Sequence, residues 1–175
     1  VNVSCNGSND GIVFATPTGG TMPYTYAWST IGAGTADTMT NASVGQVIVI
    51  VTDSLGCTAT DTVVLTEPTP VTASITASTN ATCNGQCDGT ADAAGAGGTV
   101  TTGYTFLWSA SASSQTTATA TNLCAGTHTV TVTDSLGCQV SESAFVGLSS
   151  GIAVTITPTN VLCKGDATGS AMVAA

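Results

Sequence analysis

Apolar and polar residues alternate along much of the chain, and β-branched side chains are in excess. Residues 129–133 read Thr-Val-Thr-Val-Thr, which places the Val side chains on one face of an extended strand and the Thr side chains on the other. Residues 71–76 and 153–157 are similarly rich in β-branched types. This period of two predicts half-buried strands, and clusters of turn-forming residues such as 17–20 and 54–56 predict the turns between them. No stretch favours a helix.

The pattern repeats itself about every 80 residues. Cys5-Asn6-Gly7 recurs as Cys83-Asn84-Gly85 and, in variant form, as Cys163-Lys164-Gly165. The aromatic segment 24–29 recurs at 104–109, and segment 51–57 recurs at 132–138. Because three landmarks recur in one order, we expect tandem modules at residues 1–68 and 69–150, followed by the start of a third at 151–175.

Several short strands in about 80 residues predict an all-β fold, with each module an immunoglobulin-like β-sandwich. A small barrel is the alternative. Tyr24, Tyr26 and Trp28 alternate along one predicted strand and therefore share a face, which we expect to lie in the core. Phe106 at the position of Tyr26 favours a core over a sugar-binding surface, because a packing position tolerates loss of the hydroxyl.

Charge excludes several classes of partner. The chain is 42% hydrophobic but only 6% charged, with ten carboxylates against the single cation Lys164 and a net charge of −9. Such a chain has no basic patch to neutralise phosphates or to attract anionic lipid, so nucleic acid is not expected as a partner. The longest apolar run, residues 47–51, is far shorter than the roughly 20 residues of a membrane span. We expect no membrane insertion.

Seven cysteines in a repeat-built chain predict disulfides and a secreted protein in an oxidising, extracellular setting. Each complete module has one cysteine near its start and one after its Asp-Ser-Leu-Gly turn. These positions predict the pairs Cys5–Cys57 and Cys83–Cys138. Such a staple would stabilise each module by roughly 4 kcal/mol in the chain-entropy account.

The remaining cysteines break the repeat. Cys87 and Cys124 occur only in the second module, where the first has Asn9 and Ser43, and their joint absence predicts that they form one extra bridge. Cys163 is expected to pair with a residue beyond position 175. No second matched cysteine pair is present, which argues against zinc.

Catalytic chemistry is not predicted, and we expect no enzyme activity. The one histidine, His128, corresponds to Val47 of the first module and is expected at the surface without a triad. Calcium is the cofactor that the sequence leaves open, with aspartates as candidate ligands because hard cations need clustered oxygens. These candidates are Asp10, Asp53, Asp88 and Asp134. The competing interpretation is that Asp53 and Asp134 cap their own turns.

The combined motifs resemble a known family. Cys-Asn-Gly-x-x-Asp-Gly, Gly-Gly-Thr-x-Pro-Tyr-Thr-Tyr-x-Trp-Ser and Val-Thr-Asp-x-x-Gly-Cys-Thr-Ala-Thr, read in this order, are similar to the SprB repeat of gliding-motility adhesins and giant surface proteins of Bacteroidota. The resemblance implies a long extracellular filament exported by type IX secretion, with roles in cell adhesion or gliding motility. The second module departs from the pattern at residues 96–104, where the Pro is missing and the approach to Tyr104 is longer.

The same resemblance gives meaning to Asp followed by Ser or Thr and an apolar residue, which is similar to an O-glycosylation acceptor of that bacterial group. It implies a glycoprotein. The candidate acceptors are Thr38, Ser54, Thr62 and Ser135.

The leading hypothesis is a structural repeat segment of a secreted or cell-surface adhesin or filament, whose partners are neighbouring modules and like chains. Ile48 and Ile50 alternate with the inward Val49 and Val51 and are expected to point outward as a candidate interface. The alternative is a polysaccharide-binding module that uses the variable loops at 31–40 and 110–119.

Overall fold

The computed structural model describes residues 1–29, 35–83, 85–149, 154–159 and 170–174. The elements in this part are strands together with one three-residue 3-10 turn, η1 (Ala110–Ala112). Among the described residues, no helix has the length and apolar character needed to cross a membrane. The strands are β1 (Gly11–Phe14), β2 (Thr25–Trp28), β3 (Thr38–Ala42), β4 (Gly45–Thr52), β5 (Thr58–Leu65), β6 (Thr72–Thr79), β7 (Gly89–Ala96), β8 (Thr105–Trp108), β9 (Thr119–Leu123), β10 (Gly126–Thr133), β11 (Gln139–Val146), β12 (Thr155–Thr159) and β13 (Ser170–Ala174).

Strands β6 to β11 form the second unit, a sandwich of two antiparallel three-stranded sheets. One sheet has the order β6-β7-β9 and the other β11-β10-β8. The chain therefore changes sheet after β7, β8 and β9, and it forms hairpins at its beginning and end. This is the strand arrangement of an immunoglobulin-type sandwich, with β8 in the place of the strand that carries the buried Trp of that fold. The predicted fold class is confirmed.

The core of the second unit contains the aromatic face predicted from the sequence. Trp108 of β8 is 1% exposed and packs with Leu123, Val130 and Val132, which are fully buried. Its Nε1 donates a hydrogen bond to the carbonyl of Thr117 at 3.0 Å. Fully burying each such side chain contributes about 1.5–3 kcal/mol.

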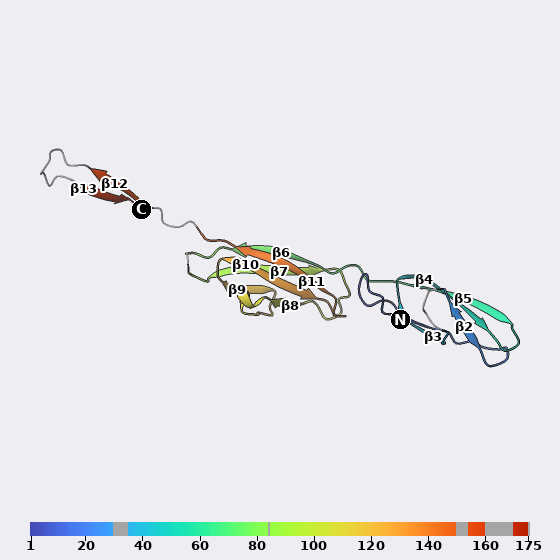
Figure 1. Ribbon diagram of the computed structural model, residues 1–175. Helices are drawn as coiled ribbons and strands as arrows, with labels where there is room; N and C mark the ends of the chain where they lie inside the picture. Colours follow the sequence, from blue (N-terminus) through green and yellow to red (C-terminus); the bar gives the residue numbers. More distant parts are fainter. Residues whose placement is uncertain (30–34, 84, 150–153, 160–169, 175) are drawn as a thin grey trace.

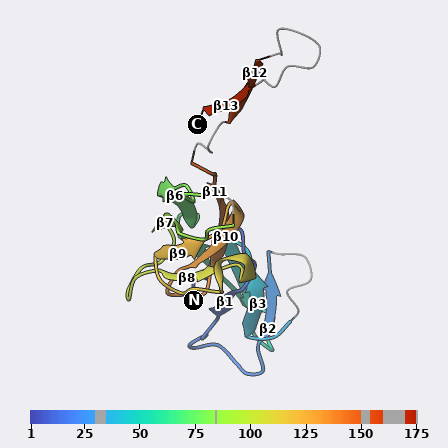
Figure 2. The same ribbon diagram turned by 90° about the vertical axis from the view of Figure 1, so that its left-hand side faces the viewer.

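Strands β1 to β5 form the first unit with the same connections. Its sheets are β1-β3 and β2-β4-β5. Met39 and Val47 are buried in its core, and Trp28 packs against them half-buried. Figure 1 shows the two units end to end, and Figure 2 shows them after a quarter turn.

Of the strand that is β6 in the second unit, the first unit contains the equivalent of the last residue. In the second unit, β6 pairs with β7 and packs Ile75 against the core. In the first unit, Val1 takes the place of the last β6 residue: it pairs with Ile12 through two backbone hydrogen bonds, as Thr79 pairs with Thr90. The space that β6 fills in the second unit is a groove of about 490 Å³ in the first. Val63 beside it is 41% exposed, whereas the equivalent Ala144 is 1% exposed.

Strands β12 and β13 pair in the register of β6 and β7. Thr159 faces Ser170 as Thr79 faces Thr90. The hairpin therefore repeats the first two strands of the second unit, in keeping with the expected third repeat.

Candidate functional site: the joint between the units

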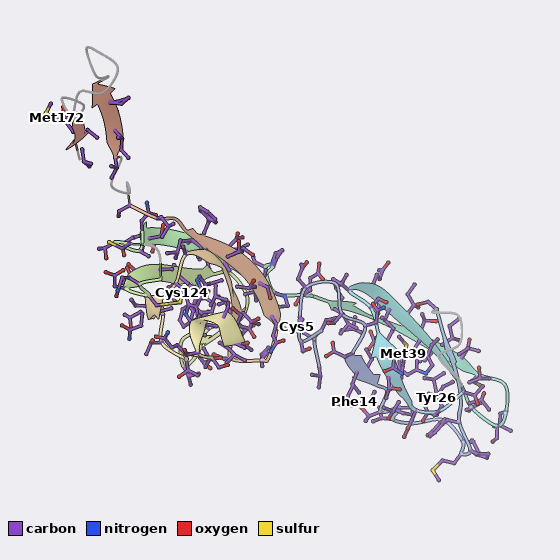
Figure 3. The ribbon with its side chains drawn as sticks, turned by 60° about the vertical axis from the view of Figure 1, so that its left-hand side comes forward. Cys5, Phe14, Tyr26, Met39, Cys124 and Met172 are labelled. Carbon is purple, nitrogen blue, oxygen red and sulfur yellow. A yellow bond between two sulfur atoms is a disulfide. The ribbon has the colours of Figure 1, made fainter. Side chains whose placement is uncertain are left out.

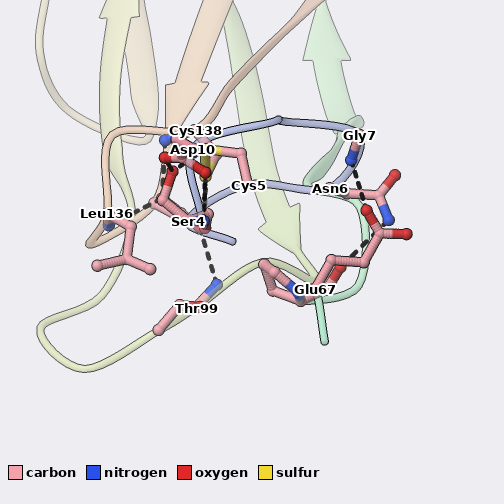
Figure 4. Close-up of a disulfide and its surroundings, with 11 residues drawn as sticks. Ser4, Cys5, Asn6, Gly7, Asp10, Glu67, Thr99, Leu136 and Cys138 are labelled. Carbon is pink, nitrogen blue, oxygen red and sulfur yellow. Dashed lines mark hydrogen bonds between the residues drawn. A yellow bond between two sulfur atoms is a disulfide. The ribbon is translucent and has the colours of Figure 1, made fainter. Parts of the chain in front are cut away.

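A disulfide crosses from one unit to the other. Cys5 lies in the loop before β1 and Cys138 in the turn between β10 and β11, and the two are bonded with their Cα atoms 5.7 Å apart. Figure 4 shows this bond, and Figure 3 labels Cys5 between the units with Met39 inside the first. Cys138 Sγ also lies 3.5 Å from the carbonyl oxygen of Ser4. The first and second units are thus covalently connected twice, by the peptide linker and by this bond.

The pairs expected within each module, Cys5–Cys57 and Cys83–Cys138, are not formed, and that expectation was wrong. The Cys83 loop lies at the end of the second unit where β10 begins, because its neighbour Cys87 is bonded to Cys124 just before that strand. Cys138 follows the other end of β10. Eight strand residues span roughly 26 Å, far beyond the about 7 Å that a disulfide allows between Cα atoms.

The other cysteines follow from the same geometry. Cys87 and Cys124, proposed as one extra bridge, are bonded to each other with Cα atoms 3.8 Å apart. Cys57 and Cys83 carry free, exposed thiols. Cys163 lies outside the described residues.

The turn that carries Cys138 is organised by one carboxylate. Asp134 accepts hydrogen bonds on Oδ1 from the N–H groups of Leu136 and Cys138, both at 2.9 Å. Its Oδ2 accepts a third from the N–H of Thr99 at 2.8 Å. The Thr99 bond is the main cause that lowers the pKa of Asp134 below its usual value. Asp134 therefore fixes the position of the cysteine that reaches the other unit.

Asp53 repeats this arrangement in the first unit. Its Oδ1 accepts from the N–H groups of Leu55 at 3.0 Å and Cys57 at 2.8 Å, and its Oδ2 accepts from Thr21 at 3.0 Å. The Thr21 bond leads the causes that lower its pKa. Cys57 is therefore held in the same kind of turn as Cys138.

The loop that carries Cys5 is closed by Asp10, which accepts from the N–H of Ser4 at 3.0 Å and from its hydroxyl. In the second unit Asp88 accepts from the N–H of Thr82 at 2.9 Å and from its hydroxyl at 2.7 Å. The hydroxyl bond is the main cause that lowers the pKa of each aspartate.

The four candidate calcium ligands therefore use their oxygens to hold their own loops. Asp10 and Asp88 close the first loop of each unit, and Asp53 and Asp134 close the hairpin turns. Within the described ranges, no group of three His, Cys, Asp or Glu side chains is placed to hold a metal ion.

The peptide linker is held from both sides. The loop of the first unit donates from Asn6 Nδ2 to the carbonyl of Pro68 at 3.2 Å and from the N–H of Gly7 to Glu67 at 2.6 Å. On the other side, the N–H of Gly98 donates to the carbonyl of Thr69 at 3.0 Å. Since Pro68 also has a fixed φ, the linker is a restrained part of the joint.

His128 is buried, which corrects the expected surface position. It is 3% exposed, with Nε2 2.9 Å from the carbonyl of Cys124 and Nδ1 3.1 Å from the hydroxyl of Ser111. Because a carbonyl only accepts, Nε2 donates to Cys124, and the Ser111 hydroxyl is the hydrogen-bond partner of Nδ1. The ring thus packs as a satisfied polar group beside the Cys87–Cys124 bridge.

The remaining predicted sites lie on the surface to different degrees. Thr38, Ser54 and Thr62 are exposed. Ser135 is half-buried, and its hydroxyl accepts from the N–H of Thr101 at 2.9 Å. On β4, Val47 and Val49 face the core, while Ile50 is 42% exposed and Ile48 is half-buried. None of these positions is among the residues that line the cleft at the joint.

Comparison with known proteins identifies the repeat. No curated protein is significantly similar to the chain. The three N-terminal domains of the highly immunogenic outer capsid protein (Hoc) of bacteriophage RB49 align at 18% identity and a TM-score of 0.49, over 87% of this chain and 57% of that one. The chain thus spans little more than half of that structure. An amphioxus IgVJ-C2 molecule aligns at 13% identity and a TM-score of 0.33, over 80% of this chain and 97% of that one. The SprB repeat family matches residues 1–33 and 75–113, so the chain carries SprB-repeat sequence in both of its units.

Proposed function

We propose that this chain is a structural segment of a cell-surface adhesin or filament, which extends from the cell and supports adhesion or gliding. The observation that carries the proposal is the Cys5–Cys138 bond, which adds a second covalent connection to the joint between two immunoglobulin-like units. A joint about which the two units rotated freely would need no second covalent connection. SprB-repeat sequence in both units supports a non-enzymatic structural module at the cell surface.

The bond determines how the chain would carry tension. From one end of the chain to the other, the shortest covalent path passes from Cys5 directly to Cys138. The 133 positions that separate these residues are bypassed. Tension therefore reaches β11 without passing through the core strands of either unit, which suits a tether.

Cells that display the parent protein test the proposal. Replacing Cys5 and Cys138 together by Ser should leave surface display unchanged but lower the shear at which cells detach, or the fraction that glide. A matched control is the Cys87→Ser/Cys124→Ser pair, which removes a bridge within one unit and leaves the joint intact. If the parent strain and both double Ser strains detach at the same shear, with equal surface display, the Cys5–Cys138 bond does not carry tension.

Export by type IX secretion and O-glycosylation belong to the same proposal. They are supported by the SprB resemblance and by the exposure of Thr38, Ser54 and Thr62. The intact mass of the native protein, compared with the mass of the bare oxidised chain, tests the glycans. Equal masses would refute them.

Binding of surface polysaccharide is the second candidate, favoured by the groove of the first unit. Tyr24, Trp28 and Asp61 contribute to its lining, together with apolar side chains of β1 and β4. The structural segment is preferred because β6 fills the equivalent space in the second unit, which makes the groove a place for a strand. Binding of the whole chain on a glycan array, lost on Trp28→Ala, would favour the second candidate. Residues 30–34 of the first variable loop lie outside the described residues.

A further inference from the structure

Two cysteines are free among the residues that the structure describes, and they correspond by repeat to the two that form the joint. Cys83 stands in the second unit where Cys5 stands in the first, and Cys57 stands in the first unit where Cys138 stands in the second. Both are exposed. Each unit therefore carries one loop cysteine, Cys5 or Cys83, and one turn cysteine, Cys57 or Cys138. The observed bond joins the loop cysteine of the first unit to the turn cysteine of the second.

The turn at Cys57 and the loop at Cys83 have the same internal hydrogen bonds as the turn and loop that meet at the joint. Cys57 is fixed by Asp53 through the same three N–H groups that position Cys138 at Asp134, with all six distances between 2.8 and 3.0 Å. The loop at Cys83 turns as the loop at Cys5 does: Gln86 N–H donates to the Cys83 carbonyl and Ser8 N–H to the Cys5 carbonyl, both at 3.0 Å.

The two free cysteines cannot bond to each other within one chain. Cys57 lies in the β4–β5 turn, at the end of the first unit away from the Cys5 loop. Cys83 lies at the end of the second unit away from Cys138, as the Cys87–Cys124 bond requires. The joint therefore lies between Cys57 and Cys83, which places the two thiols too far apart for a disulfide. A partner for either cysteine must come from another molecule or another repeat.

We propose that Cys57 and Cys83 are bonding sites for further SprB repeats, each forming a disulfide equivalent to Cys5–Cys138. Cys83 bonds the turn cysteine of the repeat that follows it, and Cys57 bonds the loop cysteine of the repeat that precedes it. The two thiols react with a small disulfide such as oxidised glutathione, which becomes two molecules of reduced glutathione. Both protons and both electrons pass to that oxidant.

Bonding at every joint would change the mechanics of a whole unit. Tension would then enter the second unit at Val71 and Cys138 and leave it at Cys83 and Ser149. The paths between these points are 12 residues through β6 and 11 residues through β11. Both strands are already extended, so the unit gains little length even when its other strands separate. The array would be inextensible, a property that does not depend on what its tip binds.

A second copy of this chain tests the proposal, because its β4–β5 turn carries Cys57 at the position equivalent to the turn cysteine of the next repeat. Cys57→Ser and Cys83→Ser variants, both carrying Cys163→Ser, are incubated separately and together at high concentration in a glutathione redox buffer. We expect each variant alone to remain monomeric and the mixture to give a disulfide-bonded heterodimer, mapped to Cys83 of one copy and Cys57 of the other. Adding Asp53→Ala to the copy that retains Cys57 should reduce the yield at least several-fold.

Two outcomes would overturn the proposal. Homodimers through Cys57–Cys57 or Cys83–Cys83 in yields comparable to the heterodimer would indicate unselective reaction of exposed thiols. Absence of the heterodimer under conditions that keep Cys5–Cys138 oxidised would show that the thiols do not form a joint. Neither outcome affects the adhesion experiment, which tests Cys5 and Cys138 alone.

Discussion

At the scale of single residues, four aspartates hold the loops that carry the cysteines of the joint and of its repeats. All four were candidate calcium ligands from the sequence, and for Asp53 and Asp134 turn capping was the competing interpretation, because both roles need an oxygen-bearing side chain beside a tight turn. The structure shows capping: the carboxylate of Asp134, for example, accepts hydrogen bonds from three backbone N–H groups. The inward face of Tyr104, Phe106 and Trp108 followed from their alternation. The burial of His128 could not be predicted from the sequence, because it depends on hydrogen bonds to the Ser111 hydroxyl and to the carbonyl of Cys124 in a loop.

The lowered pKa of Asp134 predicts how stability depends on pH. An aspartate whose pKa is lower in the folded state stabilises the fold above its unfolded value of about 3.9, and this contribution is lost as pH falls through the folded value. The melting temperature of Asp134→Asn should therefore lie below that of the parent at pH 7, and the gap should narrow progressively as the pH falls below about 4. Asp37→Asn, which removes an equal charge from an exposed loop, is the control. A constant gap from pH 7 to pH 2 would contradict the assignment.

At the scale of elements, the period-two pattern predicted the strands because one face of each is buried. It did not distinguish the role of β6, whose residues alternate like those of its neighbours. β6 completes the second unit by packing Ala73 and Ile75 on the core. The Cys87–Cys124 bridge is a difference between the units, at the end of the sandwich where β7 and β10 begin.

Removing that bridge should destabilise the second unit alone. Closing 37 residues contributes about 4 kcal/mol in the chain-entropy account, so Cys87→Ser/Cys124→Ser should lower the free energy of unfolding by about 2–4 kcal/mol. Trp108 reports the second unit and Trp28 the first, so denaturant unfolding followed by fluorescence in Trp28→Phe and Trp108→Phe backgrounds separates them. A shift seen equally in both backgrounds would show that the bridge acts on the joint instead.

The outward side of β4 makes a separate prediction. Ile48 and Ile50 occupy the positions where β10 has Thr129 and Thr131. If they form a lateral contact between chains, Ile48→Thr/Ile50→Thr should weaken self-association in sedimentation experiments while the melting temperature of the monomer changes little, because neither side chain belongs to the buried core. Unchanged association would remove these residues as an interface.

At the scale of the whole molecule, the repeat predicted two units in tandem but not how their cysteines pair. Pairing within a module and pairing between modules use the same cysteines at the same spacing. The choice depends on which end of a sandwich each loop occupies, and that depends on strand directions. Cys5 and Cys57 lie at opposite ends of the first unit, whereas Cys5 and Cys138 meet where the units join.

Single-molecule extension between the chain ends measures the consequence. With Cys5–Cys138 intact, the chain between these residues, a sequence separation of 133, cannot lengthen, and at about 3.3–3.6 Å per residue this withholds roughly 450 Å. Fully reduced chains should release this length when both units unfold. Cys5→Ser/Cys138→Ser chains keep the Cys87–Cys124 bridge, which holds back a separation of 37, so they should release roughly 330 Å. Oxidised chains that reach the same full length would show that no bond crosses the joint.

The most direct measurement of the joint is disulfide mapping of the oxidised chain by mass spectrometry. Digestion at low pH, which prevents thiol exchange, and analysis without reduction should yield a peptide containing Cys5 bonded to one containing Cys138, with Cys87 bonded to Cys124 and free thiols at Cys57 and Cys83. Recovery of Cys5 bonded to Cys57, or of Cys83 bonded to Cys138, would contradict the double covalent connection between the units.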